Sequence, residues 1–187
     1  MGKIFVTSDT HFGHDRQFIW GPRGFESCEA HDKAIIERWN AIVDPDDDVY
    51  ILGDVMLGDS AHGMECLYKL NGKIHIVRGN HDTDKRIELY KAHPKVVEVT
   101  DVIRLKYNKI HFYLSHYPTI TSNLEKESIY QCEINLMGHT HQQTDFYNGL
   151  PFCYHVGMDS HNCTPILLDD IIIEIKAEIE KCKEFLE

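Results

Sequence analysis

The 187-residue sequence predicts a single domain of the layered α/β class. Short apolar runs rich in β-branched residues alternate with segments whose apolar residues recur at helical spacing. The hydrophobic fraction of 42% and the charged fraction of 26% are ordinary for a globular protein. A chain of this length buries roughly 70% of the surface that it exposes when unfolded. With no internal repeat or linker in the sequence, residues 1–187 are expected to form one domain.

Three buried strands and three helices are predicted in the first half of the chain. The strands are near-continuous apolar runs, as expected where a sheet is covered on both faces, at residues 3–8, 49–52 and 73–78. One helix is predicted from Asp32 to Val43, because its apolar residues recur on one helical face. A second helix, around residues 64–70, ends at Asn71-Gly72, and a short third helix covers residues 84–91.

The second half is predicted to be richer in strands. Residues 96–106 and 110–115 form strands on either side of a turn at Tyr107-Asn108-Lys109 in this prediction. Further short strands are expected at residues 134–137, 152–156 and 166–168. An amphipathic helix from about Asp170 closes the chain.

Charge and cysteine usage limit the environment and the partners. The net charge of −11 counts against a surface for long duplex nucleic acid, which needs clustered cations. No apolar stretch approaches the length of a membrane span, and the run Ile4–Val6 is too short for a secretory signal. The six cysteines form no C-x-x-C pair, which favours reduced, buried thiols over disulfides or a thiolate zinc site. A cytoplasmic protein without a membrane partner is expected.

Polar side chains follow five of the predicted strands, each at the point where the strand ends. The five groups are Asp9 with His11, Gly53-Asp54, Gly79-Asn80-His81-Asp82, Ser115-His116 and Gly138-His139-Thr140-His141. Ligands of open α/β sheets bind beyond the carboxyl ends of the strands, so these side chains should converge. The glycines at 53, 79 and 138 fit a backbone that turns sharply or passes close to a bound group.

The converging donors predict a site for two metal ions. Imidazole nitrogen with carboxylate and amide oxygen, and no sulfur, suits Mn, Fe, Zn, Ni or Co. The donors are too many for one ion, whereas two ions roughly 3.5–4 Å apart would use them all if one carboxylate bridges. Asp9 and Asp54 supply two negative charges against four positive ones. The cluster would therefore stay cationic and attract a phosphate group, although the whole chain is acidic.

In this order, the blocks D-x-H, G-D, G-N-H-D, a lone His and G-H-x-H resemble the calcineurin-like metallophosphoesterase superfamily. Each block alone is weak, but the ordered set, placed at strand ends, is specific. The stretch Ser8–His14 resembles small bacterial and phage-type members. The resemblance implies a four-layer αββα sandwich, in which helices flank two mixed β-sheets. It also implies hydrolysis of a phosphoester by in-line attack of a metal-bridging hydroxide, without a covalent phosphoenzyme.

The resemblance also implies roles for single residues. One metal ion would be bound by Asp9, His11 and His141, the other by Asn80, His116 and His139, and both by Asp54. The cofactor would be a pair of divalent ions, with Mn as the first choice. His81 matches the family position that contacts the phosphate and protonates the leaving alkoxide. That role needs an imidazolium, which a nearby carboxylate favours.

Two departures from the wider family narrow the expected substrate. The Asp-Arg pair of Ser/Thr protein phosphatases is missing after Gly53-Asp54. The chain length leaves no room for a cap domain, so the site should be open. A metal pair with few additional cations favours a singly charged phosphodiester over a phosphomonoester. Small phosphoesters, nucleotides among them, are the expected substrates.

Two other functions fit parts of the same pattern. A non-catalytic metal-binding scaffold of the same fold is the main alternative. Drift to that role should erase the acid or a metal ligand, whereas His81 and every ligand position are present. A dinuclear amidase is the second alternative, and the G-N-H-D block counts against it.

The loop of residues 12–25 and the remaining histidines carry weaker signals. His14, Arg16 and Arg23 would face the substrate if the loop binds phosphate, with aromatic residues stacking on a flat group. In the alternative interpretation, Trp20 pins an ordinary loop into the core. A surface position is predicted for His31, His62, His93 and His161. A structural role is predicted for His75 and His111. A structural role is also favoured for His155, with a place at the rim of the site as the alternative.

Overall fold

The computed structural model describes residues 2–121 and 128–184, with side chains described up to residue 181. Five strands, β1 (Ile4–Thr7), β2 (Asp48–Leu52), β3 (Lys73–Val77), β4 (Val96–Thr100) and β9 (Ile166–Leu167), form one sheet. The second sheet contains β5 (Ile103–Tyr107), β6 (Ile110–Leu114), β7 (Glu133–Met137) and β8 (Cys153–His155). The helices are α1 (Gln17–Trp20), α2 (Cys28–Ile42), α3 (Ser60–Lys69), α4 (Asp84–Lys91), the 3-10 helix η1 (Tyr147–Gly149) and α5 (Leu168–Glu184).

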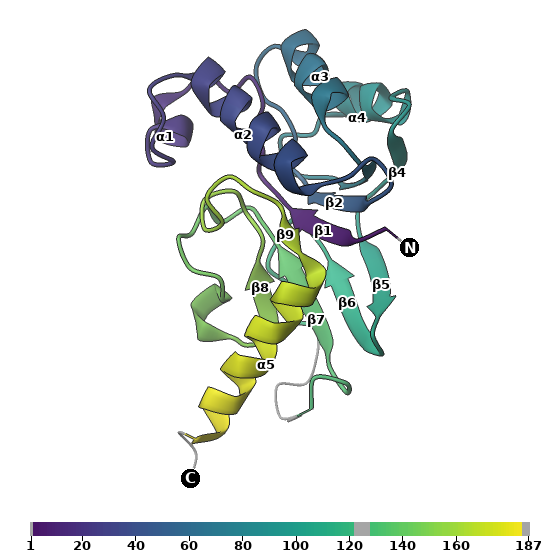
Figure 1. Cartoon of the computed structure of the whole chain (residues 1–187), viewed down its shortest axis with the longest axis vertical. Helices are drawn as coiled ribbons and strands as arrows, with labels where there is room; N and C mark the ends of the chain where they lie inside the picture. Colours follow the sequence, from purple (N-terminus) through teal and green to yellow (C-terminus); the bar gives the residue numbers. More distant parts are fainter. Residues whose placement is uncertain (1, 122–127, 185–187) are drawn as a thin grey trace.

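Both sheets are mixed. The five-stranded sheet has the order β4-β3-β2-β1-β9, in which β1 to β4 are parallel and β9 is antiparallel (Figure 1). The four-stranded sheet has the order β5-β6-β7-β8, in which β5 is antiparallel and the other strands are parallel. The predicted α/β fold, with two mixed sheets flanked by helices, is confirmed.

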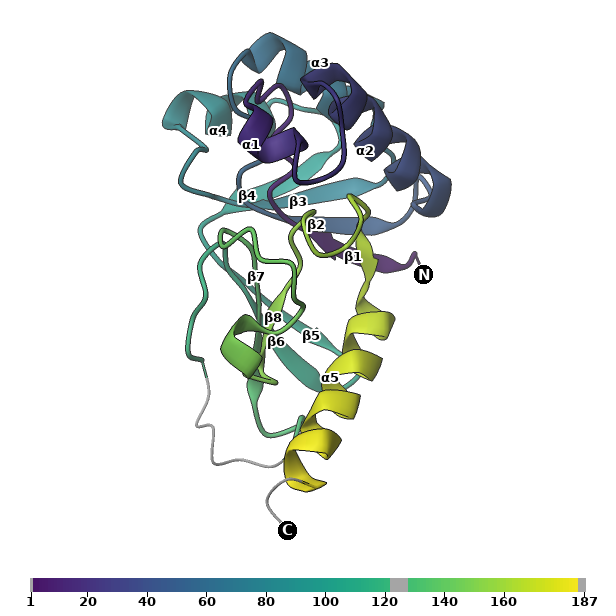
Figure 2. The ribbon, with the colours of Figure 1, turned by 90° about the vertical axis from the view of Figure 1, so that its left-hand side faces the viewer.

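Two apolar cores hold the sheets and helices together. In β1 and β2, alternate residues face opposite sides: Phe5 and Ile51 pack with α2, α3 and α4, whereas Val6 and Leu52 face the other sheet. Figures 1 and 2 show α2, α3 and α4 gathered over one face of the five-stranded sheet. Four isoleucines of α5 join the core that both sheets share: Ile171, Ile172, Ile175 and Ile179. Burial on both faces explains why these strands read as continuous apolar runs.

Some predicted boundaries are wrong. The single strand expected at residues 96–106 is two strands, because β4 pairs with β3 while β5 pairs with β6 in the other sheet. The helix expected from Asp32 begins at Cys28, where the Ser27 side chain accepts a hydrogen bond from the Ala30 backbone. The short α1 was not expected, and its buried residue is Ile19, with Trp20 only partly buried.

The predicted turn between β5 and β6 is a two-residue hairpin loop. Asn108 and Lys109 have φ values of 48° and 66°, and Tyr107 pairs with Ile110. Positive φ at both positions matches the right-handed twist of the flanking strands.

The histidines outside the predicted site divide into buried and exposed groups. The surface prediction is wrong for His31 and His93, which are only 1% and 2% exposed. His75 lies between Asp48 (3.0 Å) and Glu98 (2.8 Å), in line with its predicted structural role. His111 is exposed on β6, His62 and His161 are partly exposed, and His155 is fully buried.

The remaining composition-based predictions concern thiols and membranes. Buried thiols are found, as predicted, at Cys28, Cys66, Cys132, Cys153 and Cys163. Cys182 lies outside the described side chains. Within residues 2–121 and 128–184, no helix combines the length and apolar character that a membrane span requires.

Candidate metal centre

Seven predicted metal ligands lie together beyond the carboxyl ends of five strands. They follow β1 (Asp9, His11), β2 (Asp54), β3 (Asn80), β6 (His116) and β7 (His139, His141). Both sheets contribute ligands, so the packing of one sheet on the other sets the geometry of the site. The convergence predicted from the strand ends is present in the structure.

Asp9, His11 and His141 form the first ligand group. The Nε2 atoms of His11 and His141 lie 3.2 Å apart, and each lies 3.9 Å from Asp9 Oδ1. Burial, followed by the charge of His141, holds the pKa of His11 well below its usual value. A lowered pKa favours the neutral ring, which is the form that binds metal.

Asn80, His116 and His139 form the second ligand group. Asn80 Oδ1 lies 2.8 Å from His116 Nε2 and 2.9 Å from His139 Nδ1. His116 Nδ1 lies 2.8 Å from the carbonyl oxygen of Leu52 and can donate to it. In the neutral ring, that tautomer leaves a lone pair on Nε2 facing the Asn80 oxygen. Two facing acceptors require a cation, or a proton, between them.

Asp54 lies between the two groups. Its Oδ2 atom is 3.9 Å from His11 Nε2 and 3.5 Å from His116 Nε2. Its Oδ1 atom accepts a hydrogen bond of 2.8 Å from the His81 backbone. Burial raises the pKa of Asp54, and the neighbouring Asp9 carboxylate adds to this effect. A carboxylate so placed gains from nearby positive charge.

The donor set fits divalent cations. Asp9 Oδ1 is buried and has no hydrogen-bond partner among the described residues, although a buried carboxylate oxygen normally has one. The ligand atoms of Asp9, His11 and His141 lie within 4.8 Å of one another, as do those of Asp9, Asp54 and His116. Nitrogen and oxygen donors without sulfur suit Mn, Fe, Zn, Ni or Co.

The backbone at the centre is strained. Positive φ values, between 49° and 68°, occur at Asp9, His11, Asp54, His139 and His141. Such values cost of order 1 kcal/mol or more for each non-glycine residue and concentrate at functional sites. Glycines allow the close approach: a Cβ at Gly79 would lie 2.3 Å from Asp54 Oδ1, and one at Gly138 would lie 2.4 Å from Asp9 Oδ2. These glycines therefore pass close to the ligand carboxylates.

Asp82 fixes the backbone that carries Asp54. Its carboxylate accepts hydrogen bonds from the backbone of Asp54 (2.8 Å) and Gly79 (2.9 Å) and from the Tyr90 hydroxyl (2.8 Å). Burial raises the pKa of Asp82, against the effect of these donors. The last residue of G-N-H-D thus supports the site, a role that its sequence position alone does not reveal.

Asp159 and Arg23 support His141. Asp159 Oδ2 lies 2.9 Å from His141 Nδ1 and 2.8 Å from Arg23 Nη2. Burial would lower the pKa of His141, but the hydrogen bond to Asp159 and the charge of Asp9 outweigh it and raise that pKa. Carboxylate partners of this kind orient metal-binding histidines. This role of Asp159 is not predicted by any motif in the sequence.

A cavity of about 550 Å³ opens over the ligands. His81, His14 and Phe18 line it, together with most of the ligands. Burial lowers the pKa of His14, and the charges of His81 and Arg16 lower it further. Arg16 is exposed and does not line the cavity. The Arg23 side chain is only 1% exposed and is bound to Asp159, so it does not face a substrate there.

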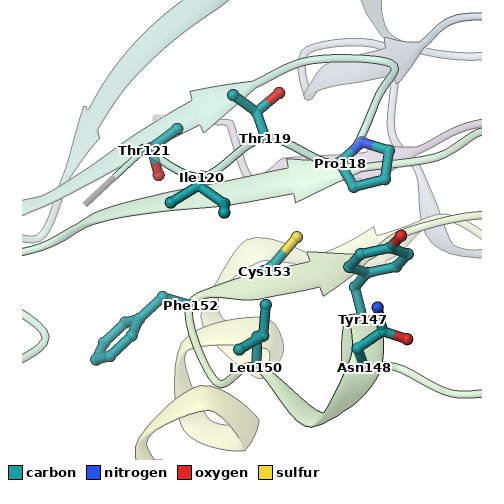
Figure 3. A pocket seen from close by; sticks show the side chains of 9 residues that line it. All are labelled: Pro118, Thr119, Ile120, Thr121, Tyr147, Asn148, Leu150, Phe152 and Cys153. Atoms are coloured by element: carbon teal, nitrogen blue, oxygen red, sulfur yellow. The ribbon is translucent and has the colours of Figure 1, made fainter. Parts of the chain in front are cut away.

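A separate cavity of about 310 Å³ lies beside β8 (Figure 3). Residues 118–121, which follow the predicted ligand His116, form one wall, and residues from Tyr147 to Cys153 form the other. None of the predicted ligands lines it. This cavity is therefore distinct from the candidate metal centre.

The fold and the donor set define an α/β protein with a candidate metal-binding centre beyond the ends of its strands. Residues 3–157 match the Calcineurin-like phosphoesterase superfamily domain. The chain belongs to this superfamily, whose reaction is the hydrolysis of phosphoesters.

Similar proteins span nearly the whole chain. An uncharacterized protein of Methanocaldococcus jannaschii is 33% identical over 180 residues, covering 92% of this chain and 90% of its own length. The gene 66 protein of Mycobacterium phage D29 is 27% identical over 213 residues, covering 97% of this chain and 99% of its own length. The structure of an Aquifex aeolicus protein of unknown function is similar, with a TM-score of 0.68 and 23% sequence identity. The match covers 92% of this chain and 99% of the Aquifex aeolicus chain. That last likeness supports the fold.

Proposed function

We propose that this protein is a dinuclear metal-dependent phosphoesterase that prefers phosphodiesters. The observation that carries the proposal is the position of Asp54. Its Oδ2 atom lies between the nitrogens of His11 and His116, at 3.9 Å and 3.5 Å, so one carboxylate faces both ligand groups. Membership of the superfamily supports the reaction class.

The ligands divide between two ions. Asp9, His11 and His141 would hold one ion, Asn80, His116 and His139 the other, and Asp54 would contact both. Mn is our first choice, with Fe, Zn, Ni or Co as alternatives, because the set lacks sulfur. When bound, such a pair polarises the phosphate and activates water for attack on phosphorus.

His81 would protonate the leaving oxygen. Its ring lines the cavity, is 42% exposed and places Nε2 3.9 Å from Asp54 Oδ2. Its backbone is held by the hydrogen bond to Asp54 Oδ1, and its carbonyl oxygen accepts a bond of 2.6 Å from Arg86. The ring is thus held beside the ligands but is free to reach a bound ester, as a general acid must.

The lining of the cavity supports the diester preference. Among the residues that the structure describes, those that line it include histidines but neither lysine nor arginine. Arg23, predicted as a substrate contact, neutralises Asp159, and Arg16 lies outside the cavity. His14 remains as a substrate contact, and the 69% exposed Phe18 beside it offers a flat apolar surface. A monoanionic diester of modest size, such as a nucleotide ester, suits these surroundings.

Hydrolysis of two model esters tests the proposal. Metal-stripped protein is reconstituted with Mn and assayed on bis-p-nitrophenyl phosphate and p-nitrophenyl phosphate. We expect turnover of both, faster for the diester, and none in Asp54→Ala. Asp15→Ala, which removes an exposed carboxylate from the neighbouring loop, is the matched control and should retain turnover.

Two outcomes would contradict the proposal. Full turnover in Asp54→Ala would exclude a mechanism that depends on the shared carboxylate. Metal binding by the native chain, without hydrolysis of either ester or of natural nucleotides, would favour the non-catalytic scaffold of the same fold.

A further inference from the structure

Another group of metal-ligating side chains lies between α2 and α3, outside the candidate centre. Asp32 projects from α2, and His62 and Cys66 project from α3, one helical turn apart on the same face. Their ligand atoms all lie within 4.8 Å of one another. His62 Nε2 is 2.8 Å from Asp32 Oδ2 and 3.5 Å from Cys66 Sγ.

These distances suit tetrahedral zinc. Bonds of about 2.0 Å to nitrogen and about 2.3 Å to sulfur place the two atoms about 3.5 Å apart at a tetrahedral angle. His62 Nε2 and Cys66 Sγ are already 3.5 Å apart. The Asp32–His62 contact is a hydrogen bond, and it would lengthen by about 0.5 Å to admit the ion, by the same bond lengths. His62 is 39% exposed at its side chain and has room for that shift.

Charge and access also favour a divalent ion at this place. The Asp32 carboxylate and a Cys66 thiolate would supply two negative charges within a largely buried group. Burial raises the pKa of the Cys66 thiol to about 12, so the thiolate would form only with a bound metal. An adjoining cavity of about 260 Å³, lined by Asp32, His62 and Cys66, leaves space for water as a fourth ligand.

We propose that Asp32, His62 and Cys66 form a further metal site, which binds zinc or a similar thiophilic divalent ion. The thiolate separates it chemically from the sulfur-free candidate centre. Asp32 Oδ2 also accepts a hydrogen bond of 2.9 Å from the Gly13 backbone, in the loop between His11 and His14. An ion at this site would therefore hold the loop that borders the cavity. The proposal does not depend on the esterase activity.

Cobalt titration of the metal-stripped chain tests the site. A cobalt–thiolate bond gives a near-ultraviolet charge-transfer band, which ligands of nitrogen and oxygen do not. The native chain should develop this band, with a final amplitude that corresponds to one thiolate-bound cobalt per chain, in addition to any cobalt that the sulfur-free candidate centre takes up. Cys66→Ser should lose the band, and His62→Gln should weaken cobalt binding at this site at least tenfold. His62→Gln changes a partly exposed side chain and should fold normally. It therefore tests the site even if Cys66→Ser, which changes a buried residue, fails to fold.

Two further variants separate the possible causes. Cys28→Ser should keep the band, although this thiol lies 3.8 Å from Asp32 Oδ2. Asp54→Ala should also keep it while losing ester hydrolysis, so failure of one proposal is distinguishable from failure of the other. Absence of the band in the native chain, its persistence in Cys66→Ser or its loss in Cys28→Ser would overturn the assignment.

Discussion

His81 is held at the site by its backbone, whereas its ring is available for chemistry. Replacement by alanine keeps the hydrogen bond from the backbone to Asp54 Oδ1 and removes only the proton donor. We expect His81→Ala to lower kcat on bis-p-nitrophenyl phosphate by about 10²–10⁴-fold, the usual contribution of a general acid. Metal content, measured in parallel, should not change. Unchanged turnover would remove His81 from the mechanism.

Asp159 supports the proposed metal centre through His141. Its carboxylate accepts from His141 Nδ1 at 2.9 Å and pairs with Arg23, so it sets the tautomer and the direction of the ring. Loss of such a partner typically costs 10–100-fold in metal affinity, and we expect roughly this loss in Asp159→Asn. Competition with a chelator measures it. Glu88→Gln, which changes an exposed carboxylate on α4, is the control; equal affinities in the two variants would contradict the role.

The convergence of the predicted ligands could be anticipated from the sequence, whereas the residues that support them could not. Each ligand follows an apolar strand within a few residues, so local pattern and fold class suffice to bring them together. Asp159 is separated from His141 by 18 residues and from Arg23 by 136. No local sequence pattern predicts contacts between residues so far apart in the chain. For the same reason, Arg23 was predicted as a substrate contact and His31, which lies 2.9 Å from it, as a surface residue.

At the scale of elements, the start of α2 depends on one side chain. Ser27 Oγ accepts from the Ala30 backbone at 3.1 Å and caps the helix that carries Asp32 and Trp39. We expect Ser27→Ala to lower the free energy of unfolding by about 1 kcal/mol, measured by urea unfolding of the metal-free protein. Thr83 occupies the same position of α4 but makes no capping bond with its side chain, so Thr83→Ala should have little effect. Equal losses in both variants would contradict this account.

Strands and helices could be predicted where burial imposes a recognisable pattern of apolar residues on the sequence, and less well elsewhere. β1, β2 and β3 are buried on both faces, which gives continuous apolar runs. The division of residues 96–106 into β4 and β5 depends on which sheet each half joins, and this is decided by pairing with distant strands. No glycine or proline within residues 96–106 marks the break in the sequence. α1 has four residues and one buried side chain, which are too few for a helical spacing of apolar residues to be recognised in the sequence.

At the scale of the whole molecule, acid should weaken the fold through His155. Burial, followed by the charge of His161, lowers the pKa of His155 from 6.5 to about 4. Between these two pH values, the unfolded chain takes up a proton that the folded chain does not. The contribution of His155 to the free energy of unfolding is therefore fully present above pH 6.5. It falls as the pH drops toward 4, by up to about 3 kcal/mol.

Urea unfolding of metal-free protein at several pH values isolates this contribution. Other groups titrate in the same range, so the comparison is between the native chain and His155→Gln, which cannot take up the proton. The native chain should lose more stability on acidification than the variant. Parallel curves for the two chains would contradict the role of His155.

We propose that Asp54 contacts two metal ions, because its carboxylate faces both ligand groups. Anomalous diffraction at the manganese edge, from crystals of the native chain grown with manganese, tests it most directly. We expect two peaks roughly 3.5–4 Å apart, one beside Asp9, His11 and His141 and the other beside Asn80, His116 and His139, with the Asp54 carboxylate between them. A single peak, or two peaks of which one lies away from Asp54, would contradict the dinuclear centre.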